Sequence, residues 1–446
     1  MARGSWAFSP HGRRRRTLRR SLIVFLILLP IGAIAWAVFS STKVYQRQPV
    51  AASTITARPS ANPSSGTVIE QGEVVNYSSE QTAALIRQAN PGYSGPAPAL
   101  KLQAFRYTMK DPNGAEVKVY ARAFISTASK EKRPVFAFAP GTTGIDDQCA
   151  ASLELPAKRN WANYASHMAA YAANGYVAVI TDYEGMRDPN RMHHYMVGQL
   201  EGRAVLDSIR AAKQLPLTKG QADTDDVFLA GYSQGGHAAY WADKIASSYA
   251  PEVTIRGVIG FGPVTDVRQT LTDTTKGANI LWFGPYVLYS YSDWYAEKYP
   301  VTAILQSPFS QNLASDIAKN CIDTNISYWG NRDIAKVYTP EFIAAMKTGS
   351  IASISPNFDK RMVENLTADT KTPSRKLINH GKQDNVVLPA QSEAALKRLC
   401  SLGSPTALRL YDATHYTTMA KSFADTLAWM QAVRSNAATL DSCPGQ

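Results

Sequence analysis

Residues 227–236 read VFLAGYSQGG, a short apolar run that stops at a serine placed between glycines. A helical pattern then extends from His237 to Tyr249. A serine on a sharp strand-to-helix turn is held in a strained backbone conformation that only small neighbours tolerate. The start of the following helix also offers unpaired N–H groups and partial positive charge. The pattern therefore predicts that Ser233 projects from the turn as a nucleophile, provided that the rest of the chain supplies its partners.

Short apolar runs and helical patterns alternate on both sides of this turn. Alternation of this kind predicts a mostly parallel sheet that helices bury on both faces. The apolar runs are 135–139, 177–181, 227–230, 258–261, 377–379 and 408–411, and the helical patterns are 162–173, 197–215, 237–249, 390–399 and 419–433. Two further strand-like runs, 105–108 and 117–125, flank a turn at 111–114 that reads DPNG. They predict a hairpin at the antiparallel edge of the sheet.

The alternation stops between about Pro263 and Ser374. This interval is much longer than an ordinary crossover, so we expect it to fold as a cap over the carboxyl edge of the sheet. Its most aromatic part, 281–289, reads LWFGPYVLY. These side chains either line an acyl-binding pocket or a mobile lid, or form the core of the cap itself. We expect residues 67–446 to form one domain that carries this insertion at about 263–374.

The composition excludes one broad class of function. The chain has 446 residues, of which 45% are hydrophobic and 18% charged, so it can bury a large core. Its net charge of +12 first suggests an anionic partner. Nine Lys and Arg residues and no acidic residue lie in 1–47, however, which leaves the rest of the chain at only +3. A nucleic-acid-binding domain needs a basic face, so we expect no nucleic-acid partner.

Residues 1–47 have the pattern of an export signal. Arginines cluster at 13–20, ahead of a nearly continuous apolar run from Leu22 to Phe39. The run is long enough to span a membrane as a hydrophobic helix and exceeds the usual core of a cleaved signal. Pro30 and small residues after it also fit cleavage, so an uncleaved anchor and a removed signal peptide both stay open. Residues 48–66, rich in Ser, Thr, Pro and Ala, predict a flexible linker.

Export also bears on the four cysteines of the chain. We expect the domain to be secreted, or anchored to the cell membrane with the catalytic part outside the cytoplasm. In an oxidising compartment two disulfides are the default, and the sequence alone allows three pairings. Unpaired buried thiols would require the body to stay in the cytoplasm.

A serine nucleophile needs a general base and a carboxylate that orients the base. After a strand-to-helix elbow the chain order is serine, then acid, then histidine. His415 follows the last predicted strand and is the expected base. The other histidines precede the serine, lie on its helix or, like His380, end a strand, and we expect them to be structural. Asp384, on the loop after the run at 377–379, is the expected acid, with Asp412 as the alternative.

An oxyanion hole would combine the backbone N–H of Gln234 with one from the loop after the first parallel strand. That loop, 139–144, reads APGTTG, and Thr142 or Thr143 would supply the amide. A plain glycine-rich turn is the alternative interpretation. The sequence shows no metal-ligand spacing, P-loop or dinucleotide motif in a suitable context. We therefore expect no cofactor and no metal.

Five features follow one another along the chain: PGTTG at 140–144, DYEG at 182–185, VGQLEGR at 197–203, GYSQGG at 231–236 and the histidine at 415. Together they resemble the secretory lipases of the lipase A type, over about 74–443. The resemblance implies an α/β-hydrolase fold with a helical cap, acting on carboxylic esters that include triacylglycerols. It also implies Ser233, Asp384 and His415 as the triad, and two disulfides, Cys149–Cys321 and Cys400–Cys443.

The chain departs from this family pattern in its oxyanion loop. The family loop often begins with His-Gly where this chain has Pro140-Gly141, so the support of the oxyanion hole is expected to differ. Asp182 and Glu184 belong to a family motif, and we interpret them as structural hydrogen-bonding groups. The cap is the variable part of the family, so the resemblance carries little about acyl chain length.

The chain is therefore expected to be an exported serine ester hydrolase, with lipase as the favoured interpretation. A short-chain carboxylesterase or an acyltransferase would use the same residues, because pocket length and water exclusion decide between them. A non-catalytic envelope binding protein on a hydrolase scaffold is the alternative from a different class. The expected partner is a lipid or small ester substrate, and the membrane is a further partner if the leader is not cleaved.

Overall fold

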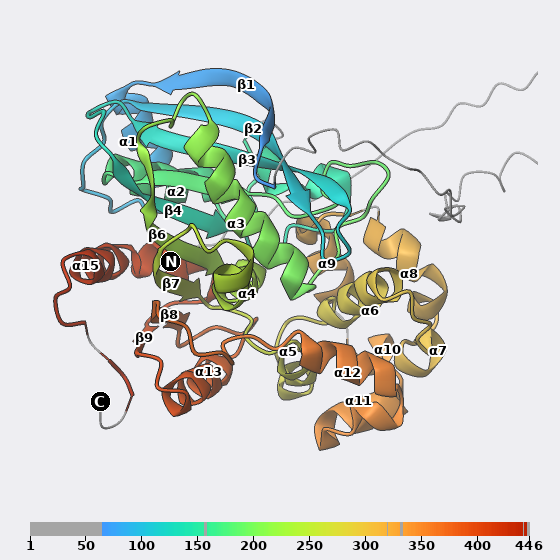
Figure 1. Ribbon diagram of the computed structural model, residues 1–446. Helices are drawn as coiled ribbons and strands as arrows, with labels where there is room; N and C mark the ends of the chain where they lie inside the picture. The colour runs from blue at the N-terminus through green and yellow to red at the C-terminus, as the bar shows by residue number, and fades with distance from the viewer. Residues whose placement is uncertain (1–64, 156–157, 319, 331–332, 440, 444–446) are drawn as a thin grey trace, which may run out of the picture. The chain divides into compact units, whose positions relative to one another are not determined.

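The sheet of the computed structural model confirms the predicted α/β architecture. The structure describes residues 65–155, 158–318, 320–330, 333–439 and 441–443. Within them one sheet has the strand order β1-β2-β3-β5-β4-β6-β7-β8-β9. The strands are β1 (Val68–Tyr77), β2 (Leu100–Lys110), β3 (Glu116–Ser126), β4 (Arg133–Ala139), β5 (Val177–Thr181), β6 (Ala222–Tyr232), β7 (Ile255–Phe261), β8 (Arg375–Gly381) and β9 (Thr406–Tyr411). From β5 to β9 neighbouring strands run parallel, whereas β1, β2, β3 and β5 pair antiparallel (Figure 1).

The predicted leader, 1–47, and nearly all of the predicted linker, 48–66, lie outside the described residues. Within the described ranges no helix combines the length and the apolar character that crossing a membrane requires. The membrane anchor and the cleaved signal peptide therefore stay predictions.

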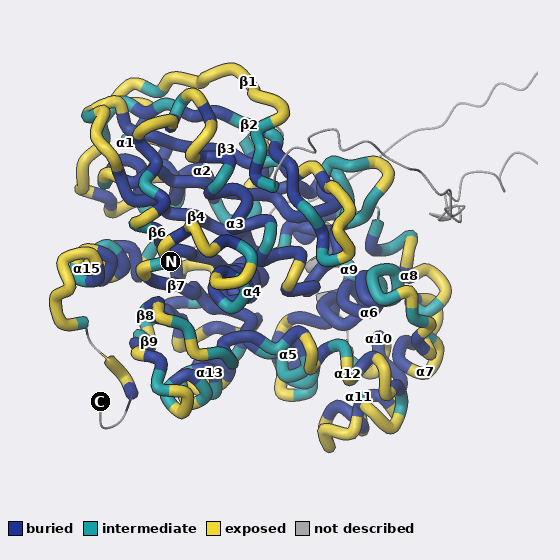
Figure 2. Tube along the Cα trace, viewed as in Figure 1, coloured by how far each residue is buried: buried dark blue, intermediate teal, exposed yellow. Residues whose placement is uncertain are grey.

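Helices cover both faces of the sheet because successive side chains of a strand point to opposite faces. In β4, Val135 and Ala137 pack into one apolar cluster, and Phe136 and Phe138 pack into another. The first cluster includes α3 (Gly198–Gln214), α4 (Gln234–Tyr249) and α13 (Pro389–Ser401), and the second includes α1 (Ser79–Ala89), α2 (Tyr164–Ala173) and α15 (Phe423–Arg434). The central strands and the helix faces against them are accordingly buried (Figure 2).

The sequence predicts the hairpin of β2 and β3 as the edge of the sheet. This is wrong, because β1 pairs with the outer side of β2 and forms the edge. Most of β1 is exposed and is coloured yellow in Figure 2. Its sequence, VIEQGEVVNY, shows no sustained apolar alternation, and its register with β2 shifts twice. A strand without a buried face leaves little periodic signal, which explains the wrong edge prediction.

Residues 262–374, called the insertion below, separate β7 from β8. The rest of the described domain, which contains the sheet, is called the body. The described part of the insertion consists of helices and connecting turns, with one isolated β-bridge. Its α-helices are α5 (Val267–Asp273), α6 (Phe283–Trp294), α7 (Val301–Ile304), α8 (Phe309–Ala318), α9 (Ile322–Gly330), α10 (Ile334–Val337), α11 (Pro340–Thr348) and α12 (Pro356–Glu364). In the aromatic stretch, Trp282, Phe283 and Tyr286 are buried, with ring centroids 5.5 to 6.5 Å from one another or from Tyr195 of the body. These aromatic side chains therefore pack the insertion against the body.

A chain of ionised groups also connects the insertion with the body. The carboxylate of Glu184, after β5, contacts Arg191 and lies 2.9 Å from His194 Nδ1. His194 Nε2 lies 2.8 Å from Asp293 Oδ2 on α6. Burial alone would lower the pKa of His194, but the charge of Glu184 and the bond to Asp293 raise it to about 9. The imidazolium thus bridges two carboxylates that come from the body and from the insertion.

Stability should depend on this imidazolium in alkaline solution. Its raised pKa means that its contribution is complete below the ordinary value of 6.5 and is lost as the pH rises through about 9. We expect the stability advantage of the wild type over His194→Gln to be about 3 kcal/mol larger near pH 6 than near pH 10. This advantage should shrink as the pH approaches about 10. Urea unfolding of both proteins across this range measures it, and a constant difference would contradict the role of His194.

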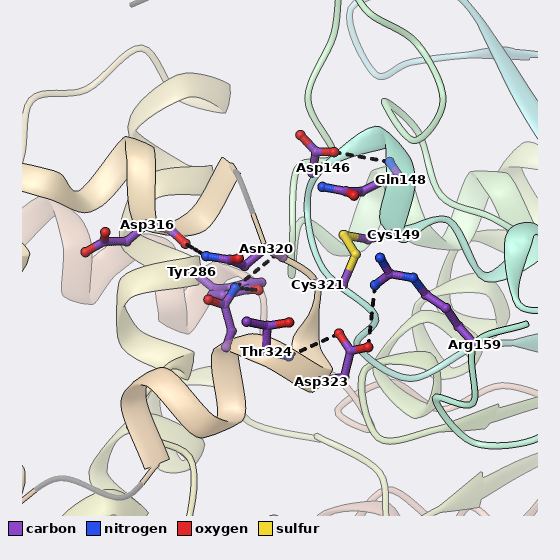
Figure 3. The surroundings of a disulfide bond; sticks show 11 residues. Asp146, Gln148, Cys149, Arg159, Tyr286, Asp316, Asn320, Cys321, Asp323 and Thr324 are labelled. Atoms are coloured by element: carbon purple, nitrogen blue, oxygen red, sulfur yellow. Dashed lines mark hydrogen bonds and ion pairs between the residues drawn. A yellow bond between two sulfur atoms is a disulfide. The ribbon is translucent and has the colours of Figure 1, made fainter. Parts of the chain in front are cut away.

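Two disulfides join segments that are distant in the sequence, and they are the pairings that the resemblance implies. Cys149–Cys321 links the loop after β4 to the residue before α9, across 172 positions. Figure 3 shows this bond beside Asp323 of α9, which lies 3.4 Å from Arg159 of the body. Cys400–Cys443 joins the end of α13 to the C-terminal segment, across 43 positions.

The double variant Cys400→Ser, Cys443→Ser should be less stable than the wild type by about 4 kcal/mol, because an open chain of this length gains loop entropy when unfolded. Denaturant unfolding in oxidising buffer measures the loss. With both proteins fully reduced the difference should vanish, which controls for the two serine side chains. Equal unfolding midpoints in oxidising buffer would contradict the expected stabilisation.

Candidate active site

The predicted elbow lies between β6 and α4, with Ser233 at the junction. Its φ of 55° and ψ of −115° are values that residues other than glycine rarely adopt. The glycines on either side permit a very close approach of backbone segments. A Cβ on Gly231 would lie 1.8 Å from the carbonyl oxygen of Gly235, and one on Gly235 would lie 1.9 Å from that of Ala139. The turn therefore requires glycine at both positions.

The predicted acid and base meet after β8 and β9. His415 Nδ1 lies 2.6 Å from Asp384 Oδ2, and Asp384 Oδ1 accepts hydrogen bonds from the N–H groups of Val386 and Val387, both at 2.9 Å. Burial raises the pKa of Asp384, but the charges and hydrogen bonds of His415 and His380 outweigh it and bring the pKa well below its ordinary value. The ionised carboxylate orients the Nδ1–H of His415, which leaves Nε2 of the ring as the candidate base.

The segment 261–264 brings Ser233 close to this pair. Ser233 donates its N–H to one carbonyl of the segment at 3.0 Å and accepts an N–H of the segment at 3.1 Å. Between these two contacts, Gly262 has a φ of 50°. A Cβ on Gly262 would lie 3.0 Å from Asp384 Oδ2 and 3.1 Å from His415 Nδ1. The three predicted residues therefore gather around one short segment at the carboxyl edge of the sheet.

The alternative acid has a different partner. Asp412 Oδ1 accepts a hydrogen bond from Gln383 Nε2 at 2.6 Å. His380, expected to be structural, is fully buried, with Nδ1 2.6 Å from Ser392 Oγ. Its Nε2 lies 2.8 Å from the carbonyl oxygen of Val387 and 3.2 Å from Asp384 Oδ2. The geometry thus favours Asp384 as the partner of His415 and leaves Asp412 as a loop contact.

The predicted oxyanion loop begins beside the elbow because β4 and β6 are neighbouring parallel strands. Thr142 Oγ1 lies 2.8 Å from the hydroxyl of Tyr195 in the body. The carbonyl oxygen of Thr143 accepts the first N–H of α9 at 2.9 Å. The loop is therefore contacted both by the body, through Tyr195, and by the insertion, through α9. The roles of Gln234, Thr142 and Thr143 as oxyanion donors stay predictions.

A buried polar cluster beneath the elbow was missed by the sequence prediction. Gln234 Nε2 lies 2.7 Å from Glu201 Oε1 and 2.8 Å from His193 Nε2, and Glu201 Oε2 lies 2.6 Å from His237 Nδ1. All four side chains are at most 1% exposed. The available signal was a carboxylate among the apolar positions of a helix that the pattern predicts to be buried.

A cavity of about 560 Å³ lies between the body and the insertion, and the predicted catalytic residues do not line it. It is lined by Pro112, Asn113, Val197, Gln199, Trp241, Trp294, Tyr295, Glu364 and Asn365. Among the described residues no group of three His, Cys, Asp or Glu side chains is arranged to hold a metal ion.

Comparison with known proteins identifies the family. The model of the secretory lipase family matches residues 165–442, which is more than half of the chain. The chain belongs to the secretory lipase family. Lipase A of Moesziomyces aphidis is 34% identical over 137 residues, which cover 30% of this chain and 26% of the relative. Lipase 9 of Candida albicans is 26% identical over 283 residues, which cover 60% of this chain and 58% of the relative.

A secreted triacylglycerol lipase of Malassezia furfur is 30% identical over 167 residues, which cover 33% of this chain and 42% of the relative. In all three cases the match spans less than two thirds of the relative's own length.

Similar solved structures support an α/β-hydrolase fold for this member of the secretory lipase family. The rice cell wall degrading esterase LipA from Xanthomonas oryzae superposes with a TM-score of 0.67 and 18% identity, over 83% of this chain and 97% of that one. Candida antarctica lipase A in its closed state gives a TM-score of 0.60 and 20% identity, over 85% of this chain and 84% of that one. Both identities are low, so these likenesses concern the fold alone.

Substituting Asp384 should separate the two candidate acids. Asp384→Asn should lower kcat for ester hydrolysis by about 10⁴-fold, because an amide no longer selects the Nδ1–H tautomer of His415. Asp412→Asn, the matched control, should stay within about threefold of the wild type, because Asp412 contacts Gln383. Hydrolysis of a p-nitrophenyl ester gives kcat, and thermal unfolding shows that each variant is folded. The reverse pattern would assign the orienting role to Asp412.

Proposed function

We propose that this chain is a serine carboxylic ester hydrolase that acts through an acyl-enzyme. Ser233 Oγ attacks the acyl carbon while His415 Nε2 takes the hydroxyl proton. The proton then passes to the departing alcohol as the ester bond breaks. A water molecule attacks the acyl-enzyme, again with His415 as base and then acid, and the carboxylic acid leaves. The protein is regenerated without a cofactor.

The observation that carries this proposal is the 2.6 Å contact between His415 and Asp384 next to a strained serine. A contact made by Nδ1 leaves Nε2 for the nucleophile, and the shared contacts with 261–264 hold the pair at the elbow. Gln234 and Thr142 or Thr143 would supply N–H groups to the tetrahedral oxyanion. The position of Gln234 at the start of α4 supports this role, because the first N–H groups of a helix have no partner within it.

An acylglycerol is the proposed substrate, and secretion or attachment to the cell membrane is the proposed destination. Membership of the secretory lipase family supports the substrate class and secretion, and the leader pattern at 1–47 supports export or attachment. A short-chain carboxylesterase or an acyltransferase would perform the same first half-reaction. A binding protein that does not turn over would need a reason to keep Ser233 in a strained conformation.

Two measurements test the reaction and the substrate class. A fluorophosphonate probe should label the folded wild type at Ser233, and Ser233→Ala should be unlabelled and inactive. Peptide mapping locates the label. An unlabelled folded wild type would contradict the hydrolase proposal and favour the binding protein.

p-Nitrophenyl esters of rising acyl length, with and without emulsified triacylglycerol, should then show cleavage of long chains and of the emulsion. A wild type that cleaves only short esters would remove the lipase assignment and leave a carboxylesterase. Transfer of the acyl group to an added alcohol in preference to water would identify an acyltransferase.

A further inference from the structure

Few side chains hold the backbone that directly follows Ser233. Gly235 and Gly236 come directly after Gln234, and Gly231 precedes the elbow. Glycine has no side chain, so these positions are held only through their backbone, which packs closely against neighbouring segments. Gln234 is the one residue between Ser233 and His237 whose side chain can anchor the first turn of α4.

The side chain of Gln234 is anchored in a fully buried site. Its Nε2 group donates to Glu201 Oε1 at 2.7 Å and to His193 Nε2 at 2.8 Å. Burial lowers the pKa of His193 to about 4, so its ring is neutral and Nε2 accepts. Its Nδ1–H donates to the carbonyl oxygen of Glu184 at 3.1 Å. Both hydrogens of the Gln234 amide are therefore used.

Glu201 is itself fixed from several directions. Its Oε1 also accepts the N–H of Met196 at 3.1 Å, and its Oε2 lies 2.6 Å from His237 Nδ1. His237 Nε2 lies 2.8 Å from the carbonyl oxygen of Asn365, at the end of α12 in the insertion. A carboxylate that is 0% exposed is costly to bury, and each oxygen of this one has a hydrogen-bonding partner.

Two residues of the chain between β5 and α3, Tyr183 and His193, also support the loop that would supply the second oxyanion donor. Tyr183 donates its hydroxyl to the carbonyl oxygen of Pro140 at 2.5 Å, at the start of the loop after β4. The ring of His193 stacks on that of Tyr183, with centroids 5.0 Å apart and an angle of 11°. One buried layer thus contacts the side chain of Gln234 and the backbone of Pro140, on the two segments predicted to supply the oxyanion donors.

We propose that Glu201 is a positioning residue of the oxyanion site, which aims the backbone N–H of Gln234 by holding the Gln234 side chain. The inference rests on the proposed hydrolase function and deepens it. Glu201 acts on the transition state through Gln234 and touches no substrate. Its loss should therefore weaken stabilisation of the tetrahedral oxyanion more than it weakens substrate binding.

Glu201→Gln and Gln234→Met test this inference, alone and combined. Each single variant should lower kcat about 10- to 100-fold, less than the loss of a whole oxyanion donor, with KM changed by less than about threefold. The double variant should lose little more than the worse single variant, because both changes cut one contact. Steady-state kinetics on one p-nitrophenyl ester give these values.

Inhibition by a trifluoromethyl ketone separates an effect on the oxyanion site from an effect on stability alone. Ser233 Oγ adds to its carbonyl carbon and gives a hemiketal oxyanion, so its inhibition constant reports the oxyanion site directly. In the variants this constant should rise by the same factor by which kcat/KM falls. Glu154→Gln is the matched control, since Glu154 is also a buried carboxylate, bonded to the backbone N–H groups of 161, 162 and 165. It should lower the melting temperature and leave kcat and ketone inhibition unchanged.

Wild-type values of kcat and ketone inhibition in folded Glu201→Gln and Gln234→Met would overturn the inference. So would losses no larger than those of Glu154→Gln at equal loss of stability. If Glu201→Gln does not fold, Gln234→Met decides alone, because methionine keeps the volume and removes only the amide. A wild type that reacts with neither the fluorophosphonate nor the ketone would instead overturn the hydrolase proposal itself.

Discussion

The site depends on a close contact between backbone segments at the ends of neighbouring strands. The last residue of β4 and the first turn of α4 approach so closely that a single methyl group on Gly235 would overlap the carbonyl of Ala139. Sheet register produces this contact, since Ala139 pairs with Gly231 across β4 and β6. The same register continues through β7, β8 and β9, so the loops that carry the nucleophile, the acid and the base leave the sheet at one edge. Ser233 is strained because this crowding leaves it no other conformation.

Features that depend on local sequence could be predicted. The glycines around Ser233 are a local steric requirement, and the buried strands are apolar on both faces, so both leave direct signals in the sequence. Chain order alone separated His415 from the other histidines, because only His415 follows the last strand. The helix boundaries were approximate, and the final predicted helix is in fact interrupted between α14 (Thr418–Lys421) and α15.

Features that depend on contacts between distant segments could not be predicted in the same way. Asp384 and Asp412 are both acidic residues on loops near His415, and only the folded chain shows which carboxylate reaches the imidazole. Glu201 is a single charged position in a helix, and its meaning comes from Gln234, which lies 33 residues away. Strand β1 is held mainly by backbone hydrogen bonds to β2, which side-chain periodicity does not report.

The disulfide between Cys149 and Cys321 restricts how the insertion can move. The insertion leaves the sheet after β7 and returns to it at β8, so its two ends are fixed. Cys321, near the middle of the insertion, adds a covalent attachment to the loop after β4. The Thr143 carbonyl of the same loop accepts a hydrogen bond from the start of α9. A segment tied only at its ends can swing as one flap, but a third attachment removes that freedom. Any motion of the insertion is therefore confined to the pieces between its attachments, while the start of α9 stays tied to the loop after β4.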